Sequence, residues 1–463
     1  MSENLTDFLY LVTIVTFILA LRFLSSPKRA RQGNLLGAAG MALAIAVTLA
    51  QKGLGNFVWI GLAMAIGAVI GVVGARSVKM TAMPQMVALF NGVGGGAVAL
   101  IALAEFHNLT PLPGELPAEE SITILLSALI GSISFSGSLI AFAKLQELLS
   151  GRPIVYPGQQ YVNAAVLLTA LVLGGLIVAG AEGDVLIVAL IVAALTFGVL
   201  FVLPIGGADM PVVISLLNAF TGLAASATGF VLDSTVLIVA GMLVGASGTF
   251  LTLMMARAMN RSVANVLFGA FGQVQAGPAG ERTDDGRTVR ATTPDDVAVQ
   301  LSFARKVVVV PGYGMAVAQA QHDVRQLAEV LEERGVDVAY AIHPVAGRMP
   351  GHMNVLLAEA NVPYDQLKEM DEINPEFAQT DVALVIGAND VTNPAARSEP
   401  SSPIYGMPIL DVDKAASVIV MKRSMNPGFA GIDNELYLDP RTTMLFGDAK
   451  DSVVKLIGAV KAQ

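Results

Sequence analysis

The hydropathy of this chain changes abruptly near residue 260, and that change constrains the fold more than any single motif does. Before it, apolar runs of about 20 residues follow one another closely, whereas afterwards short apolar stretches alternate with polar ones. Because an α-helix rises 1.5 Å per residue, a run of that length crosses the roughly 30 Å hydrocarbon core of a bilayer. The sequence therefore predicts a polytopic α-helical membrane bundle fused to a C-terminal α/β domain of the doubly wound, Rossmann-like class.

The composition supports this division and excludes several classes of function. Charged residues make up only 14% of the chain, against about 25% in a typical soluble protein. The net charge of -9 argues against a nucleic-acid partner. The chain has no cysteine, which excludes disulfides, thiol catalysis and cysteine-ligated zinc or iron–sulfur centres. No metal site is expected.

We expect about nine membrane spans, and their loops predict the orientation of the bundle. The spans are predicted near residues 5–24, 34–50, 57–74, 86–104, 122–142, 161–180, 185–203, 211–230 and 236–255. Loops on one side carry most of the basic residues, namely Arg22, Lys28, Arg29, Arg31, Arg76, Lys79, Lys144, Arg152, Arg257 and Arg261. On the other side, residues 105–120 include four acids and neither lysine nor arginine. The positive-inside rule then places the N-terminus outside and the C-terminal domain in the cytoplasm.

Polar side chains within the predicted spans are costly in hydrocarbon and therefore mark candidate functional positions. Asp209 begins the eighth span, and Asn218 follows about 13 Å further along a helix axis. Asn91 opens a glycine-rich stretch, and the fifth span carries Ser132, Ser134, Ser136 and Ser138. One interpretation makes Asp209 a helix N-cap and lets the serines bond back to their own helix. The other joins these groups into a hydrated proton path between helices.

Glycines are frequent in the spans and predict close packing of helices. They include Gly92, Gly94, Gly95, Gly96, Gly174, Gly175, Gly241, Gly245 and Gly248. A pore-lining position is the alternative for some of them.

The segment between the two halves is polar and irregular from about residue 269 to residue 302, and it includes Gly277-Pro278-Ala279-Gly280. Such a composition buries too little apolar surface to form a packed core, so it predicts a tether. We therefore divide the chain into a transmembrane domain at 1–260, a linker or hinge at 261–302 and a cytoplasmic domain at 303–463.

The C-terminal domain alternates apolar strand patterns with helical ones. Strands are predicted at 306–310, 336–342, 381–386, 409–412, 417–421 and 436–438, with one helix reaching residue 333 and another at 450–460. The first strand leads into Gly312-Tyr313-Gly314, but Val317 occupies the third glycine position of the dinucleotide fingerprint. The glycines would let the backbone approach a pyrophosphate at a helix N-terminus. A tight strand-to-helix turn without nucleotide is the alternative.

The ends of two strands favour NADP over NAD. Residues 343–348 follow the second strand without the acid that usually holds the ribose hydroxyls of NAD. Lys422-Arg423-Ser424 ends another strand, and two cations with a hydroxyl suit a dianionic phosphate. A solvated strand end is the alternative for that segment. His343 and His352 are expected on surface loops.

Asp390 follows the strand predicted at 381–386, in Gly387-Ala388-Asn389-Asp390. Ligands of open α/β sheets lie beyond the carboxyl ends of the strands, so Asp390 is expected near the nucleotide. A carboxylate beside a phosphate either bonds to amides or hydroxyls, or its protonation responds to the ligand. A simple loop cap is the alternative.

Across essentially its whole length, the chain resembles the beta subunit of the proton-translocating NAD(P) transhydrogenases. The resemblance rests on residues 206–211 (GGADMP), 311–316 (PGYGMA), 345–351 (VAGRMPG), 387–390 (GAND), 422–424 (KRS) and 445–450 (LFGDAK). It implies an enzyme in which this chain binds NADP(H) and a partner alpha subunit binds NAD(H). It also implies direct hydride transfer coupled to proton movement in a bacterial cytoplasmic membrane, additional partner helices and a dimer of the whole complex.

The resemblance also assigns roles to individual residues, none of which is a catalytic side chain. The NADP(H) contacts would be Gly312, Tyr313, Gly314, Met315, Ala316, Val345, Ala346, Gly347, Arg348, Met349, Pro350, Gly387, Ala388, Asn389, Asp390, Gly406, Met407, Lys422, Arg423, Ser424, Gly428, Phe429, Asp448 and Ala449. The proton path would include Asp209, Asn218, Asn91 and Ser138. Some members of the family have histidine where this chain has Asn91, and tyrosine is common at the position of Phe429.

Two other classes of protein fit the same two-part architecture. One is an ion channel or transporter gated by a cytoplasmic Rossmann-type sensor. Gly312-Tyr313-Gly314 mimics the filter sequence of a potassium channel, but it lies between a strand and a helix rather than between membrane spans. The other is a membrane scaffold with a vestigial nucleotide fold.

Overall fold

The chain folds into two compact units in a computed structural model. One unit comprises Met1–Gly206 with Val212–Thr252, and the other comprises Gly207–Pro211 with Leu253–Gln463. The structure describes residues 3–463 except 27–28, 52–54, 79–81, 110–117, 151–152, 182, 207–208, 260–261, 264–287, 349–350, 401, 403 and 429.

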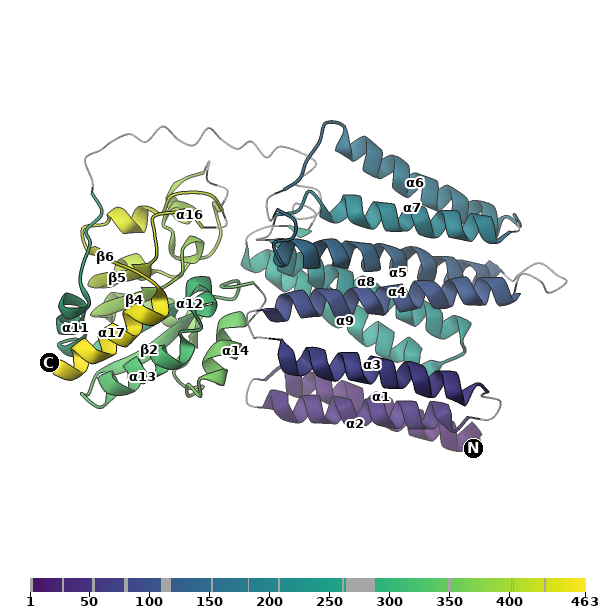
Figure 1. The fold of residues 1–463 in the computed structure, drawn as a ribbon, viewed down its shortest axis with the longest axis horizontal. Coiled ribbons are helices and arrows are strands. Elements are labelled where there is room, and N and C mark those ends of the chain that lie inside the picture. Colours follow the sequence, from purple (N-terminus) through teal and green to yellow (C-terminus); the bar gives the residue numbers. More distant parts are fainter. Residues whose placement is uncertain are drawn as a thin grey trace. The chain divides into compact units, whose positions relative to one another are not determined.

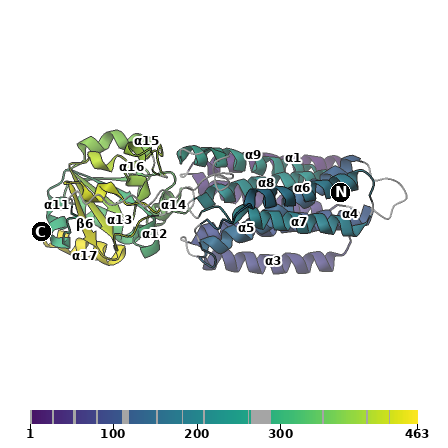
Figure 2. The same ribbon diagram turned by 90° about the horizontal axis from the view of Figure 1, so that it is seen from above.

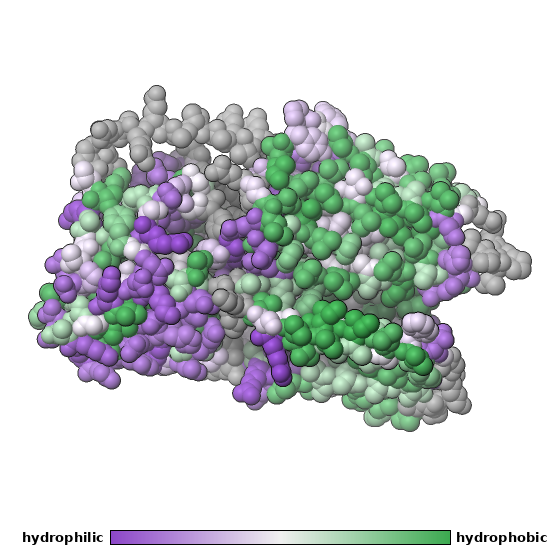
Figure 3. Space-filling view, in the orientation of Figure 1, coloured by the Kyte–Doolittle hydropathy of each residue, from purple (hydrophilic) through white to green (hydrophobic). Residues whose placement is uncertain are grey.

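The first unit is a bundle of long helices, as the sequence predicts. Within the described residues, nine helices are long and apolar enough to cross a membrane. They are α1 (Glu3–Leu24), α2 (Ala30–Leu49), α3 (Phe57–Ser77), α4 (Met83–Leu109), α5 (Ala118–Leu145), α6 (Gln159–Val178), α7 (Asp184–Val202), α8 (Met210–Val231) and α9 (Thr235–Ala258) (Figures 1 and 2). Apolar side chains cover much of the bundle surface, and polar ones much of the α/β domain surface (Figure 3). The chain is a multi-pass membrane protein.

Glycines bring several helices of the bundle into backbone contact. A Cβ on Gly95 of α4 would lie 2.8 Å from the Gly131 carbonyl oxygen of α5, and one on Gly131 would lie 2.7 Å from the Gly95 oxygen. On α8 and α9, a Cβ on Gly222 would lie 2.6 Å from the Gly245 nitrogen. Close packing is therefore confirmed at these positions. Around Gly175 there is open space instead.

The second unit contains a parallel six-stranded sheet in the order β3-β2-β1-β4-β5-β6. The strands are β1 (Lys306–Pro311), β2 (Asp337–Ile342), β3 (Leu367–Glu369), β4 (Val382–Ile386), β5 (Ser417–Lys422) and β6 (Thr442–Phe446). The larger helices are α11 (Pro294–Ser302), α12 (Tyr313–Ala318), α13 (Gln321–Glu332), α14 (His352–Glu359) and α17 (Ala449–Ala462), with the shorter α15 (Met370–Ile373) and α16 (Ala395–Ser398). This order confirms the predicted doubly wound fold.

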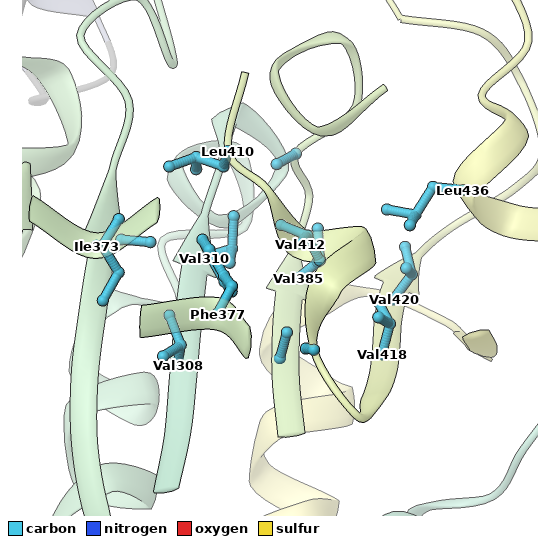
Figure 4. Close-up of a cluster of buried hydrophobic side chains, with 14 of the residues drawn as sticks. Val308, Val310, Ile373, Phe377, Val385, Leu410, Val412, Val418, Val420 and Leu436 are labelled. Carbon is cyan, nitrogen blue, oxygen red and sulfur yellow. The ribbon is translucent and has the colours of Figure 1, made fainter. Parts of the chain in front are cut away.

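The core of this domain lies on the strands and the segments that cover them. Valines of β1, β4 and β5 point to one face, where they meet side chains from two 3-10 helices, η5 (Asn374–Gln379) and η8 (Glu435–Leu438), and from neighbouring segments (Figure 4). The buried cluster on this face includes Val308, Val310, Ile373, Phe377, Val385, Leu410, Val412, Val418, Val420, Leu436, Tyr437 and Met444. Burial of the central strands on both faces explains their nearly continuous runs of β-branched residues.

Two of the predicted strands are wrong. Residues 409–412 form no strand because the Asn374 side chain bonds their backbone, donating to the Ile409 oxygen at 3.0 Å and accepting from the Asp411 nitrogen at 3.0 Å. Residues 436–438 belong to η8, whose first turn is capped by Asn434. The outer strands β3 and β6 were not predicted.

The helix predicted to follow the first strand is broken in two. Gln319 adopts a left-handed φ of +52°, which ends α12 before α13 begins. Such a cap is usually marked by glycine, and because glutamine stands here the break could not be predicted from the sequence.

Part of the predicted tether is folded. Residues 264–287 lie outside the described residues, but α11 buries Val297, Ala298 and Leu301 and packs against α17. Ala291 also forms a parallel bridge with Met444 of β6. Residues 291–302 therefore belong to the α/β domain rather than to a linker.

Candidate functional site

The segments that follow the strands meet at one edge of the sheet, because all six strands run in parallel. The structure thus brings together, at the carboxyl ends of five strands, the predicted segments 312–316, 343–348, 387–390, 422–424 and 448–449. This is the edge where open α/β sheets bind ligands. The sheet order reverses between β1 and β4, so 312–316 and 387–390 flank the switch point.

The turns after β1 and β4 pack directly against each other. The Gly312 nitrogen donates to the Ile386 oxygen at 2.9 Å, and the Gly314 nitrogen donates to the Gly387 oxygen at 3.0 Å. A Cβ on Gly314 would lie 2.7 Å from the Gly387 Cα, and Gly387 has a left-handed φ of +67°. These glycines are therefore required by the packing of the two turns against each other. The helix after Gly312 is only six residues long.

His343 and His352 are buried, so the expectation of surface positions is wrong. His343 Nε2 donates to the Pro408 oxygen at 2.8 Å, while its Nδ1 accepts from the Val345 nitrogen at 3.2 Å. His352 Nδ1 accepts from the Arg348 nitrogen at 3.0 Å. Burial lowers the pKa of His343 to about 4, and burial together with the Arg348 charge lowers the pKa of His352 to about 4. Two neutral imidazoles thus shape the loop after β2.

Arg348 and Tyr313 connect that loop to the turn after β1. The Arg348 guanidinium carbon lies 4.4 Å from the centre of the Tyr313 ring, a cation–π contact. His352 lies beside the same ring, with a centroid separation of 6.4 Å. The structure therefore brings two predicted contact residues together across β1 and β2.

The turn after β4 carries a network of polar side chains. Asn389 Oδ1 accepts from the Tyr437 hydroxyl at 2.8 Å and from Asn434 Nδ2 at 3.1 Å. Asp390 Oδ2 accepts from the Ala430 nitrogen at 3.0 Å. Gly428 lies against this carboxylate, because a Cβ there would be 2.6 Å from Asp390 Oδ1. Neither Asn434 nor Tyr437 belongs to a motif of the sequence, and no local signal would have identified them.

Cations lie at the end of β5, beside this network. The Lys422 ammonium is 5.0 Å from the centre of the Tyr437 ring and donates to the Asn426 oxygen at 2.5 Å. Burial lowers the pKa of Lys422, against the raising effect of the Asp390 and Asp433 charges. Arg423 and Ser424 are exposed. This edge can therefore offer two positive charges and a hydroxyl to an anion.

The remaining predicted contacts fall into three groups. Asp448 caps α17, since its side chain accepts from the Lys450 and Asp451 nitrogens, and Ala449 begins that helix. Gly406 and Met407 line a cavity of about 490 Å³ whose other lining residues include Met370 and Asp371, which directly follow β3. Met349, Pro350 and Phe429 lie outside the described residues.

In the bundle, Asn91 joins serines of the neighbouring helix. Asn91 Nδ2 donates to Ser138 Oγ at 2.9 Å and to Ser134 Oγ at 3.3 Å, from α4 to α5. Ser134 Oγ in turn donates to the Leu217 oxygen of α8 at 2.9 Å and lies 2.5 Å from Thr221 Oγ1. We call Asn91, Ser134, Ser138 and Thr221 the three-helix cluster. Thr221 lies one helical turn beyond Asn218, a spacing that could have marked it.

The other polar residues of the spans behave differently. Ser136 bonds back to the Ser132 oxygen of its own helix at 3.1 Å, as the simpler interpretation expects. Asn218 is half-buried on α8, next to Leu217, and Asp209 immediately precedes α8. The structure thus unites Asn91 and Ser138 in one cluster, and it places Asn218 and Asp209 on or beside the third helix that forms it.

Comparisons with known proteins agree with one another. A family model described as the NAD(P) transhydrogenase beta subunit matches residues 6–459. The NAD(P) transhydrogenase subunit beta of Rhodospirillum rubrum is 51% identical over 464 residues, which cover 99% of this chain and 100% of that relative. A relative of the same name from a specified strain of that organism gives identical values.

Proposed function

This chain belongs to the NAD(P) transhydrogenase beta subunit family, and we propose that its α/β domain binds NADP(H) at the carboxyl edge of the sheet. The observation that carries the proposal is the position of Lys422, Arg423 and Ser424 beside the turn that holds Asn389 and Asp390. A dianionic 2′-phosphate is the group of NADP that needs such a set of donors. The channel and scaffold alternatives have no comparable support.

The residues at this edge fit the cofactor. The loop after β2 holds Arg348 and two neutral histidines and no acid, so the ribose-binding carboxylate of an NAD site is missing there. Among the described residues, the buried Asn389 Nδ2 has no hydrogen-bond acceptor. A buried donor of this kind is costly unless a ligand oxygen accepts from it.

The chain contributes binding and orientation rather than acid–base chemistry. Bound NADP(H) would supply the hydride exchange, so no side chain has to act as a general acid or base. The turns at Gly314 and Gly387 pack against each other and would line the nucleotide site. The Arg348–Tyr313 contact and the His352–Arg348 hydrogen bond fix the loop that flanks it.

The family name implies an alpha subunit as partner. We propose that this partner binds NAD(H), presents it for direct hydride transfer and contributes additional membrane helices, and that two such complexes form a dimer. The absence of a second strand-end set of cations in the described part of the sheet supports one nucleotide site in this chain.

For the bundle, we propose a proton path through Asp209, Asn218 and the three-helix cluster, which includes Asn91 and Ser138. Asn91 offers hydrogen bonds but no titrating proton, so water, the neighbouring hydroxyls or a partner group must carry the proton past it. We assign proton translocation to residues 1–260 and NADP(H) binding to the α/β domain, which comprises residues 303–463 and the folded residues 291–302 that pack on it. The distribution of basic residues supports an external N-terminus and a cytoplasmic α/β domain in a bacterial membrane.

A binding experiment tests the cofactor assignment. The full-length chain in detergent is titrated with NADPH and with NADH, and we expect NADPH to bind at least about 100-fold more tightly. Arg423→Gln should weaken NADPH binding by about tenfold and leave NADH unchanged, because it removes a phosphate contact. Arg334→Gln, at an exposed arginine after α13, is the matched control. Equal affinities for the two nucleotides would refute the assignment.

A further inference from the structure

Phe446 ends β6 at the carboxyl edge of the sheet, and the residue is 42% exposed. Side chains alternate along a strand, so Thr442, Met444 and Phe446 share one face. Met444 belongs to the core cluster of Figure 4, as do Val418 and Val420 of the adjacent β5. Phe446 therefore lies at the outer margin of the face that this cluster buries.

Lys422 is the register partner of Phe446. The two residues pair across β5 and β6, and the Gly447 nitrogen donates to the Lys422 oxygen at 3.1 Å. Lys422 follows Val418 and Val420 by even spacings, so its side chain leaves the same face as Phe446 does. Because neighbouring strands lie about 4.8 Å apart, the Lys422 cation and the Phe446 ring leave the sheet side by side, close enough for one nucleotide to contact both.

Two other aromatic rings that the structure describes at this edge are engaged by protein groups. The Arg348 guanidinium lies over Tyr313, and Lys422 lies over the buried Tyr437. Phe446, in contrast, is exposed, and it pairs directly with Lys422, the first residue of the 422–424 segment. Aromatic rings bind nucleotide bases by stacking, with little dependence on the base.

We propose that Phe446 is the stacking platform for the adenine base of the nucleotide whose 2′-phosphate Lys422, Arg423 and Ser424 bind. The inference rests on the proposed NADP(H) function and adds the residue that holds the base. In adenosine 2′-phosphate, base and phosphate share one ribose, so a platform beside the cations meets both at once. The ring stabilises the base through its face and adds no charge to the phosphate site.

The test compares two ligands and three variants of the full-length chain. NADPH is titrated directly, and adenosine 2′,5′-bisphosphate, which lacks the nicotinamide half, is measured by competition. We expect Phe446→Ala to lower the affinity for both ligands by the same factor of about ten. Phe446→Trp should keep binding within about twofold of the unmodified chain, because indole also stacks. Phe303→Ala, at an 84% exposed phenylalanine that precedes β1 at the opposite edge, should change neither affinity.

Three results would overturn the inference while leaving the NADP(H) site intact. In the first, Phe446→Ala binds both ligands as the unmodified chain does. In the second, the loss is confined to NADPH, which would place Phe446 near the nicotinamide. In the third, Phe446→Trp loses as much affinity as Phe446→Ala, which would make the ring a packing element. Failure of the unmodified chain to bind NADPH would instead refute the proposed function itself.

Discussion

In the bundle, Gly95 of α4 contacts Gly131 of α5, and in the α/β domain Gly314 contacts Gly387. Both contacts bring two backbones close enough to place a polar side chain against a neighbouring element. In the bundle that side chain is Asn91, bonded to serines, whereas in the α/β domain the turn carries Asn389 and Asp390 beside the Lys422 cation. The same backbone device therefore positions neutral groups in one region and charged groups in the other.

The surrounding solvent accounts for this difference. Ionised side chains are expensive in hydrocarbon, so a cluster between membrane helices is built from amides and hydroxyls that satisfy one another. At the edge of a soluble sheet, water and half-burial allow charges that would bind an anion. The charges that would bind an anion belong to the α/β domain, whereas the three-helix cluster offers a proton only neutral amides and hydroxyls.

The largest difference between the two regions should be in how their stability depends on acid pH. His343 and His352 ionise near pH 6.5 when unfolded but have a pKa of about 4 when folded. Well above pH 6.5 the two histidines are neutral in both the folded and the unfolded state. As the pH falls toward 4.5 they become protonated in the unfolded state but stay largely neutral in the folded state, so unfolding is favoured. The α/β domain should therefore lose on the order of 2 to 3 kcal/mol per histidine over this window. The three-helix cluster contains no group that titrates there.

Two probes follow the unfolding of the α/β domain and of the bundle separately in the intact chain. Limited proteolysis reports opening of the α/β domain, and the fluorescence of Trp59, the single tryptophan, reports the bundle. His352→Gln should remove about half of the pH dependence, while His322→Gln, at an exposed histidine of α13, should remove none. A Trp59 signal that changes in parallel with proteolysis would contradict the comparison.

Substitution of Gly387 should have the next largest effect. Alanine there would require a left-handed conformation costing about 1 to 2 kcal/mol and would force Cβ against Gly314, costing about 1 to 3 kcal/mol more. We expect Gly387→Ala to destabilise the α/β domain by about 4 kcal/mol, measured by urea-dependent proteolysis. Gly335→Ala is the control, because Gly335 has a φ of +84° but open space around its Cβ position. Equal losses in both variants would show that the turn contact contributes nothing.

Removal of the Asn91 amide should have the smallest effect on stability and a specific effect on coupling. Asn91→Leu leaves Ser134 and Ser138 without their donor, at a cost of about 1 to 2 kcal/mol in detergent unfolding. With the partner subunit supplied, hydride exchange in vesicles should no longer respond to a proton gradient. Asn163→Leu removes a buried amide bonded to the Leu200 oxygen, outside the cluster, and should keep that response. A retained response in Asn91→Leu would reduce the cluster to a packing element.

Sequence reasoning was most successful where one physical requirement fixes the length of an element. The nine spans and β1, β2, β4 and β5 follow from the thickness of a bilayer and from burial on both faces of a sheet. It failed where a distant side chain decides the backbone, as with Asn374, which bonds residues 409–411 and prevents a strand. It also missed β3, whose three residues Leu367, Lys368 and Glu369 carry no apolar alternation.

The candidate site was predicted to a similar degree. The segments at strand ends were identified because parallel strands deliver their carboxyl ends to one edge. Burial of His343 and His352 could not be foreseen, since it depends on the Pro408 oxygen and the Arg348 amide as partners. The spacing from Asn218 could have marked Thr221, but its bond to Ser134 depends on the neighbouring helix α5 and could not be foreseen.

The Leu217 oxygen has a mechanical consequence for α8. The Ser134 hydroxyl of α5 and the Thr221 hydroxyl both lie within hydrogen-bond distance of this oxygen, at 2.9 and 3.0 Å, and because they also bond to each other, one of the two donates to it. In a regular helix the Thr221 amide uses the same oxygen. An acceptor shared between a hydroxyl and an amide holds each of them less firmly, and hydroxyls that bond to the preceding turn bend helices. Bending stiffness along α8 should therefore be lowest around Leu217, beside Asn218. The helix that begins next to Asp209 would then flex in its middle rather than move as a rigid rod.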